Sequence, residues 1–191
     1  MKWTKKKIII ASAVAAAVVI AVVLTLVLVL SGRVGKMAGK YEASVSSVTS
    51  AVTVTEVKNA DVVAYSKEET ITFTEGDNAE IVTKIKQLSD YKMDFEESTT
   101  TASGEIDRNS LVAVKLDAGL FRKKSYHGST FTGKVSAENA AELFSGGAVS
   151  VDGDVDVKVV FSGNLVSSIT CSYKSASGLL TTMTITYAYG K

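Results

Sequence analysis

Few side chains in this 191-residue sequence are of the types that catalysis or metal binding uses. There is one cysteine, Cys171, and one histidine, His127. A single cysteine can form neither an intramolecular disulfide nor a four-thiolate zinc site, and one histidine excludes a multi-histidine metal centre within one chain. Cys171 alternates with Ile169 and Tyr173 on the apolar side of an expected strand, which predicts a buried structural thiol.

The other candidate motifs are incomplete. His127 lies in a turn-like stretch, residues 123–128, where no neighbour in sequence is identified as the orienting partner that a general base needs. Residues 152–156, DGDVD, resemble the opening of a calcium loop, but Val157 and Gly163 occupy the positions that require Gly and Glu. We expect a polar turn leading into a strand there. We therefore expect no catalytic residue, cofactor or metal site and a non-enzymatic protein, with an unrecognised envelope enzyme as an alternative.

The charge is divided unevenly along the chain. Residues 1–40 contain seven basic residues and no acidic one, and the remaining 151 residues carry 14 − 20 = −6. A net charge of +1 with an acidic main part does not predict binding to nucleic acid.

The strongest signal is the apolar stretch 8–30, in which Ser12 and Thr25 are the only polar residues. A helix of this length reaches roughly 35 Å, enough to cross a hydrocarbon core of about 30 Å. We expect a single transmembrane helix that is kept as a signal anchor. A cleaved signal peptide is the alternative, although its apolar region usually runs about 7–15 residues.

The flanks of this stretch predict its orientation. Four lysines precede it within residues 1–7, whereas three basic residues follow it within 31–40. The positive-inside rule then places residues 1–7 in the cytoplasm as a basic tail. Residues 31–40 contain three glycines and are expected to form a juxtamembrane linker. The expected protein is a single-pass protein of the cell membrane with an extracytoplasmic domain, residues 41–191.

The domain is expected to be α+β and dominated by an antiparallel sheet. Three runs near the C-terminus, 155–161, 169–173 and 179–189, alternate apolar and polar residues and are separated by Gly-containing turns, which is typical of a meander. Further strands are expected at 43–57, 61–65, 69–75, 91–97, 111–116 and 129–135.

Two segments have helical spacing instead. In residues 78–89, Ile81, Ile85 and Leu88 follow one another at i, i+4 and i+7 after a capping-box type start. Ser136 can cap a helix over residues 137–145. Leu143 and Phe144 lie on its expected inner side, and two glycines end the segment.

The run 155–190, VDVKVVFSGNLVSSITCSYKSASGLLTTMTITYAYG, resembles the closing strands of bacterial envelope half-barrels of the lipoprotein-carrier type. The resemblance implies an antiparallel sheet curled around short helices, with lipid or lipoprotein acyl chains in the hollow. Under this hypothesis the two expected helices offer ligand-binding side chains to the hollow, namely Ile81, Ile85, Leu88, Leu143 and Phe144.

Three interpretations of function follow. The first is a domain of the bacterial cell envelope that binds an apolar ligand, a lipid, or a protein partner. The second is a structural or adhesive surface domain without a pocket. The third is the envelope enzyme named above.

Overall fold

The computed structural model describes residues 32, 35–88, 94–144 and 149–190. The tail expected at 1–7 and the transmembrane span expected at 8–30 lie outside the described residues. Over the described residues, no helix combines the length and the apolar character needed to cross a membrane.

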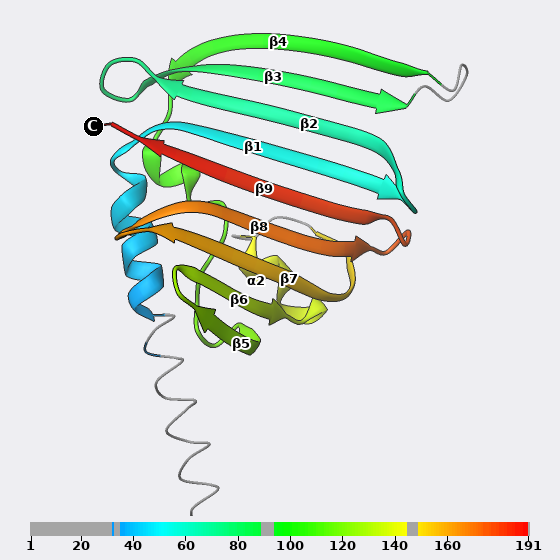
Figure 1. Cartoon of the computed structure of the whole chain (residues 1–191). Coiled ribbons are helices and arrows are strands. Elements are labelled where there is room, and N and C mark those ends of the chain that lie inside the picture. The colour runs from blue at the N-terminus through cyan, green and yellow to red at the C-terminus, as the bar shows by residue number, and fades with distance from the viewer. Residues whose placement is uncertain (1–31, 33–34, 89–93, 145–148, 191) are drawn as a thin grey trace, which may run out of the picture.

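The described residues form one antiparallel sheet of nine strands, in the order β4-β3-β2-β1-β9-β8-β7-β6-β5 (Figure 1). This confirms the sheet-dominated α+β class. The strands are β1 Val48–Asn59, β2 Val62–Phe73, β3 Asn78–Leu88, β4 Phe95–Glu105, β5 Phe121–His127, β6 Thr130–Val135, β7 Val151–Ser162, β8 Leu165–Ser175 and β9 Leu180–Tyr189.

The topology consists of two meanders joined at the centre of the sheet. Strands β1 to β4 run outward to one edge, and strands β5 to β9 run inward from the other edge until β9 pairs with β1. The connection from β4 to β5 therefore passes from one edge of the sheet to the other. It contains the 3-10 helix η1 Arg108–Leu111.

The helices pack on one face of the sheet, which we call the inner face. They are the helix at 35–45, η1, the 3-10 helix η2 Ala137–Asn139 and α2 Ala140–Leu143. Their apolar residues share one buried cluster with strands β6 to β9; Met37, Leu111 and Leu143, for example, join Val157 and Ile185. The helix expected at 137–145 is confirmed over residues 137–143 as η2 and α2.

The helix at 35–45 corrects the prediction of a flexible linker at 31–40. Residues 35–40 are helical, and Met37, Tyr41 and Val45, spaced by four residues, are 2%, 1% and 0% exposed. This spacing places the three side chains on one side of a helix, and the sheet covers that side. The segment is therefore part of the folded domain.

The helix expected at 78–89 is wrong, because these residues form β3. Nine residues of β3 pair with β2, and the whole strand pairs with β4 in an unbroken register. The spacing of four between Ile81 and Ile85 fits both a helix and a strand, since four is an even number. Val82 and Thr83 add β-branched side chains, which favour a strand. The expected cap is instead the turn of a hairpin, with Gly76 at φ 58°.

Several strand boundaries also differ from expectation. The expected strands 61–65 and 69–75 are one strand, β2, and the expected strand 43–57 is helical to 45 before β1 begins at Val48. Residue 111 is the last of η1 and residues 112–116 form a loop, although Leu111, Val114 and Leu116 are buried. The expected strand 91–97 lies partly outside the described residues, and β4 continues to Glu105. The strand expected at 129–135 and the C-terminal meander are confirmed.

The two halves of the sheet are covered very differently. In the covered half, β5 to β9, alternate residues such as Val155, Val159 and Ile169 are fully buried. In the open half, β1 to β4, only Val48, Ala51 and Ala79 are buried, all at the same end of the strands. No residue of β2 is buried, and every residue of β4 is exposed.

A buried pair of tyrosines joins the helix at 35–45 to the sheet. The hydroxyls of Tyr41 and Tyr187 lie 2.7 Å apart, and they lie 3.2 Å and 3.0 Å from the carbonyl oxygen of Leu111. Two hydroxyl protons are available for these three contacts. The hydroxyl of one tyrosine therefore donates to the hydroxyl of the second tyrosine, and the second donates to the carbonyl oxygen of Leu111. Burial raises the pKa of Tyr41 to about 12 and raises that of Tyr187 as well.

These pKa shifts predict a loss of stability in alkaline solution. Unfolded tyrosines ionise near pH 10, whereas the folded domain keeps both hydroxyls protonated above that value. The contribution of the two hydroxyls to the unfolding free energy should not change with pH below about pH 10. It should fall as the pH rises from 10 towards 12, by at most about 1.4 kcal/mol per pH unit for each tyrosine.

Urea unfolding at several pH values, followed by circular dichroism, measures this dependence. The double variant Tyr41→Phe/Tyr187→Phe should lose about 1–3 kcal/mol at pH 8 through the missing hydrogen bonds. Its curve should then be flatter than that of the wild type above pH 10. Parallel curves for the two proteins would show that the tyrosines are not held protonated by the fold.

Candidate apolar ligand-binding face

The candidate site lies on the inner face where the covered half meets the open half. Residues directly opposite one another in paired strands point to the same face of a sheet. Ile185 is 2% exposed and belongs to the inner face, so Met183 and Thr181 share that face. From there the register assigns inner-face residues strand by strand, because Met183 lies opposite Cys171 and Thr181 lies opposite both Tyr173 and Val57.

Half-buried apolar side chains form a row across the strands of this face, with members staggered by up to two residues. Val57 lies opposite Tyr65, and Tyr65 lies opposite Gln87, two residues along β3 from Ile85. At the other end, the ring of Phe144, just after α2, lies 5.7 Å from that of Tyr173. We call this row the apolar band; its members are Phe144, Tyr173, Met183, Val57, Tyr65 and Ile85, and all are partly exposed.

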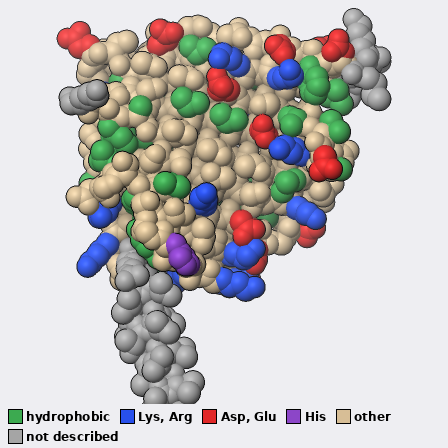
Figure 2. Space-filling model, viewed as in Figure 1, with side chains coloured by type: hydrophobic (Ala, Val, Ile, Leu, Met, Phe, Trp, Pro, Cys, Tyr) green, Lys and Arg blue, Asp and Glu red, His purple; other side chains and the backbone are tan. Residues whose placement is uncertain are grey.

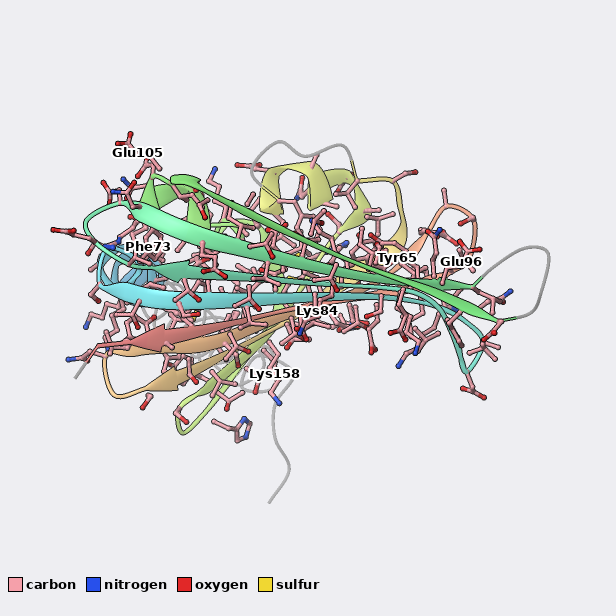
Figure 3. The ribbon with its side chains drawn as sticks, turned by 90° about the horizontal axis from the view of Figure 1, so that it is seen from above. Tyr65, Phe73, Lys84, Glu96, Glu105 and Lys158 are labelled. Atoms are coloured by element: carbon pink, nitrogen blue, oxygen red, sulfur yellow. The ribbon has the colours of Figure 1, made fainter. Side chains whose placement is uncertain are left out.

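The apolar band spans the strands from β8 to β3. At about 4.8 Å between neighbouring strands, this is about 19 Å along the sheet. Figure 3 shows Tyr65 on the side of the sheet where the helices lie, with Lys84 and Lys158 on the opposite side. The band is therefore an elongated apolar surface with one end at a helix and the other in the open half.

A charge pair lies beside the apolar band. Lys67 and Glu69 are on the inner face of β2, opposite Ile85 and Thr83, and their charged groups lie 2.8 Å apart. Each charge has a partner in the other, so a ligand that covers this part of the face leaves no charge unpaired. An unpaired buried charge would be far more costly.

The outer face of the open half has a different character. Lys84 pairs with Glu68 and Lys86 with Glu97, each at 2.8 Å. Figure 2 shows acidic and basic side chains interspersed over the upper part of the visible face. Mixed charges of this kind are typical of a solvated surface.

The five residues predicted from the sequence to bind a ligand do not come together. Ile85 and Phe144 belong to the apolar band but lie at its opposite ends. Ile81 is on the inner face opposite Ile71, Leu143 is fully buried in the core, and Leu88 lies opposite Phe95 on the outer face.

The apolar band also contains Tyr65, Val57, Tyr173 and Met183, which were not predicted from the sequence as ligand-binding residues. The alternation around Cys171 already placed Tyr173 on the apolar face, and Met183 shared the phase of Ile185. Tyr65 was assigned to the end of a short strand, whereas β2 continues past it to Phe73. Its position in the middle of the open half depends on the pairing with β1 and β3.

The residues considered for catalysis lie apart from this face or are buried. Cys171 is fully buried, and burial raises the pKa of its thiol to about 12. His127 is exposed at the end of β5, with Nδ1 3.1 Å from Oγ of Ser125. No three His, Cys, Asp or Glu side chains are grouped so that they could hold a metal ion in the part of the chain that is described.

The acidic run 152–156 is strand, not the turn that was expected. It belongs to β7, whose pairing with β8 shifts register between Asp152 and Asp156, and Gly153 has a φ of 90°. The carboxylate of Asp154 lies 3.0 Å from Arg122, and that of Asp156 lies 2.7 Å from Lys134. These carboxylates thus pair with basic side chains of β5 and β6.

No family model and no curated protein matches the chain. Among solved structures, LprF from Mycobacterium bovis is similar with a TM-score of 0.42 at 9% identity, over 83% of this chain and 92% of that one. The redesigned β-barrel mFAP1, bound to DFHBI, reaches 0.23 at 7% identity over 76% and 98%. The dehydratase domain from the CurK module of the curacin polyketide synthase reaches 0.23 at 9% identity over 74% and 75%. At these TM-scores, function has to be argued from the residues of this chain.

The burial of Cys171 predicts an unreactive thiol. A reagent needs both access and a thiolate, and Cys171 offers neither in the folded domain. Incubation with an aromatic disulfide reagent at pH 8 should release almost no thiolate over minutes, whereas the same protein in urea should react with one equivalent. Rapid reaction without denaturant would contradict the burial of β8.

Proposed function

We propose that this domain is a non-enzymatic binding module of the cell envelope that holds the acyl chain of a lipid along the apolar band. The observation that carries the proposal is the row of half-buried apolar side chains across five strands of the inner face. The charged side chains beside this row, Lys67 and Glu69, are paired with each other. The row is narrow, apolar and spans five strands, so it suits an elongated apolar ligand such as an acyl chain.

The driving force would be removal of apolar surface from water. Each Å² of apolar surface that is buried contributes about 25 cal/mol, and the exposed parts of Tyr65, Ile85 and Met183 would be covered together with the chain of the ligand. Binding has to offset the ordering of a flexible chain. A band that already lies on a paired sheet costs little further ordering of the protein.

Photo-crosslinking tests this site in the full-length chain. The protein is placed in vesicles that contain a phospholipid with a photoactivatable acyl chain, and crosslinked peptides are mapped by mass spectrometry. We expect crosslinks in β3 around Ile85 and in β9 around Met183, in addition to any within 8–30. Ile85→Trp projects a bulky ring at the open end of the band, in the place that the acyl chain would take, and should reduce the crosslinks in β9 severalfold.

Lys84→Trp is the matched control, because Lys84 neighbours Ile85 in the same strand but points to the outer face. It should leave the crosslinks in β9 unchanged. Both variants should keep the circular dichroism spectrum of the wild type. Crosslinks confined to 8–30 in the wild type, or an equal loss in both variants, would refute an acyl-chain site on the band.

We also propose that the apolar stretch 8–30 anchors the chain in the membrane with the C-terminus outside the cytoplasm. The support is the length of the stretch and the four lysines before it. The described domain adds that the chain enters it through a helix packed against the sheet, with no flexible spacer at 35–40.

A cysteine at Gly190 tests this orientation. An added Cβ there meets Cγ2 of Thr49 at 3.4 Å, an ordinary contact, so Gly190→Cys should fold normally. On intact cells it should react with a membrane-impermeant thiol reagent, while the wild type, whose one cysteine is buried, should not. After a carbonate wash the chain should remain in the membrane fraction at 20.1 kDa. Labelling only after lysis, or a shorter chain in the medium, would contradict the proposal.

A further inference from the structure

The two edges of the sheet differ in how they are protected. An edge strand exposes unpaired N–H and C=O groups, and proteins usually guard it with lysines, prolines, bulges or short length. β5 has such guards, because it has 7 residues, includes the basic run 122–124, and has a register shift with Lys123 at φ 49°. These features interrupt the regular row of hydrogen-bonding groups that another strand would need.

β4 at the opposite edge lacks the lysines, prolines, bulges and short length of a guarded edge, and its charged side chains, Glu96, Glu97 and Glu105, are confined to its two ends. It has 11 residues, all exposed, and pairs with β3 without a register shift, and it contains no proline, lysine or arginine. Its central residues, 98–104, are uncharged and run Ser-Thr-Thr-Thr-Ala-Ser-Gly. Within the described residues no strand pairs with its outer side (Figure 1). A regular strand of this kind is suited to pairing with another strand.

The charges of β4 identify a second copy of the same strand as a fitting occupant. Glu96, Glu97 and Glu105 lie near its two ends. In an antiparallel pair of two β4 strands centred on Thr100, all 11 residues are paired, and each glutamate lies opposite a residue that is not acidic. These opposite residues are Gly104, Ser103 and Phe95, respectively.

The neighbouring registers are less favourable. A two-fold axis perpendicular to the sheet keeps the inner faces of both copies on the same side. Residues of one face must then lie opposite residues of the same face, which restricts the registers that the pair can adopt. A shift towards Glu105 places Glu97 opposite Glu105, and like charges directly opposite are destabilising. A shift the other way leaves Glu105 without a partner in β4. The register centred on Thr100 also places Thr99 opposite Thr101, a threonine pair of the kind that stabilises sheets.

We propose that two copies of this chain associate through antiparallel pairing of their β4 strands, in the register that places Thr100 opposite Thr100. This joins the two nine-stranded sheets edge to edge. It uses the edge of the open half and leaves the apolar band uncovered, so this inference is independent of acyl-chain binding.

Single cysteines test both the association and its register. In the full-length chain, kept in solution by a mild detergent, Thr100→Cys brings two thiols directly opposite each other and should form a disulfide-linked dimer under mild oxidation. Thr99→Cys is the matched control, because its thiol lies opposite Thr101 of the other copy and two positions away from the thiol that the same substitution introduces there. It should give at least tenfold less dimer. The native Cys171 is buried and should not contribute.

Sedimentation of the uncrosslinked protein supplies a second measurement. The wild type should sediment as a dimer. Thr100→Lys places two ammonium groups opposite each other and should raise the dissociation constant of the dimer at least tenfold. Thr186→Lys, at an exposed position in the interior strand β9, should have no effect. Equal crosslinking of both cysteine variants, a wild type that is monomeric at all concentrations, or a dimer insensitive to Thr100→Lys would overturn the proposal.

Discussion

The placement of the helices on the sheet depends on the buried contact of Tyr41 and Tyr187 with the carbonyl oxygen of Leu111. It joins three segments that are distant in sequence, namely the helix at 35–45, the crossing between β4 and β5, and the last strand. Each hydroxyl would be costly to bury alone, since an unsatisfied buried polar group costs about 1–3 kcal/mol. The three groups satisfy one another only if all three segments are in place, so the contact specifies how the helices sit on the sheet.

This placement explains why the two halves of the sheet differ. The helices cover the inner face over β6 to β9, and there alternate residues, such as Phe131, Val157 and Ile169, are buried. Most of the length of β2 to β4 lies beyond the helices, and η1 reaches only the end of β2, where Arg108 lies over the ring of Phe73. A central strand such as β2 can therefore carry Lys67, Glu68 and Glu69 in succession, because both of its faces reach water. The apolar band lies at the boundary between these environments.

The covered half could be predicted from the sequence and the open half could not. Alternation over 155–189 correctly indicated three strands and the burial of Cys171 and Ile185, because one buried face imposes a period of two. In β3 no face is fully buried, so the pattern is weak. The pair Ile81 and Ile85 then fitted a helix as well as a strand. Tyr65 could be assigned to the site only once its partners in β1 and β3 were known.

The same lack of cover gives the open half two surfaces of different use. Its inner face has apolar side chains whose partners do not fully enclose them, and its edge has backbone groups whose partners are missing among the described residues. The inner face can be covered by a flexible apolar chain, which needs no fixed register. The edge is satisfied only by another strand, whose register the glutamates of β4 restrict. Because one surface is a face and the other an edge, occupation of either leaves the other accessible.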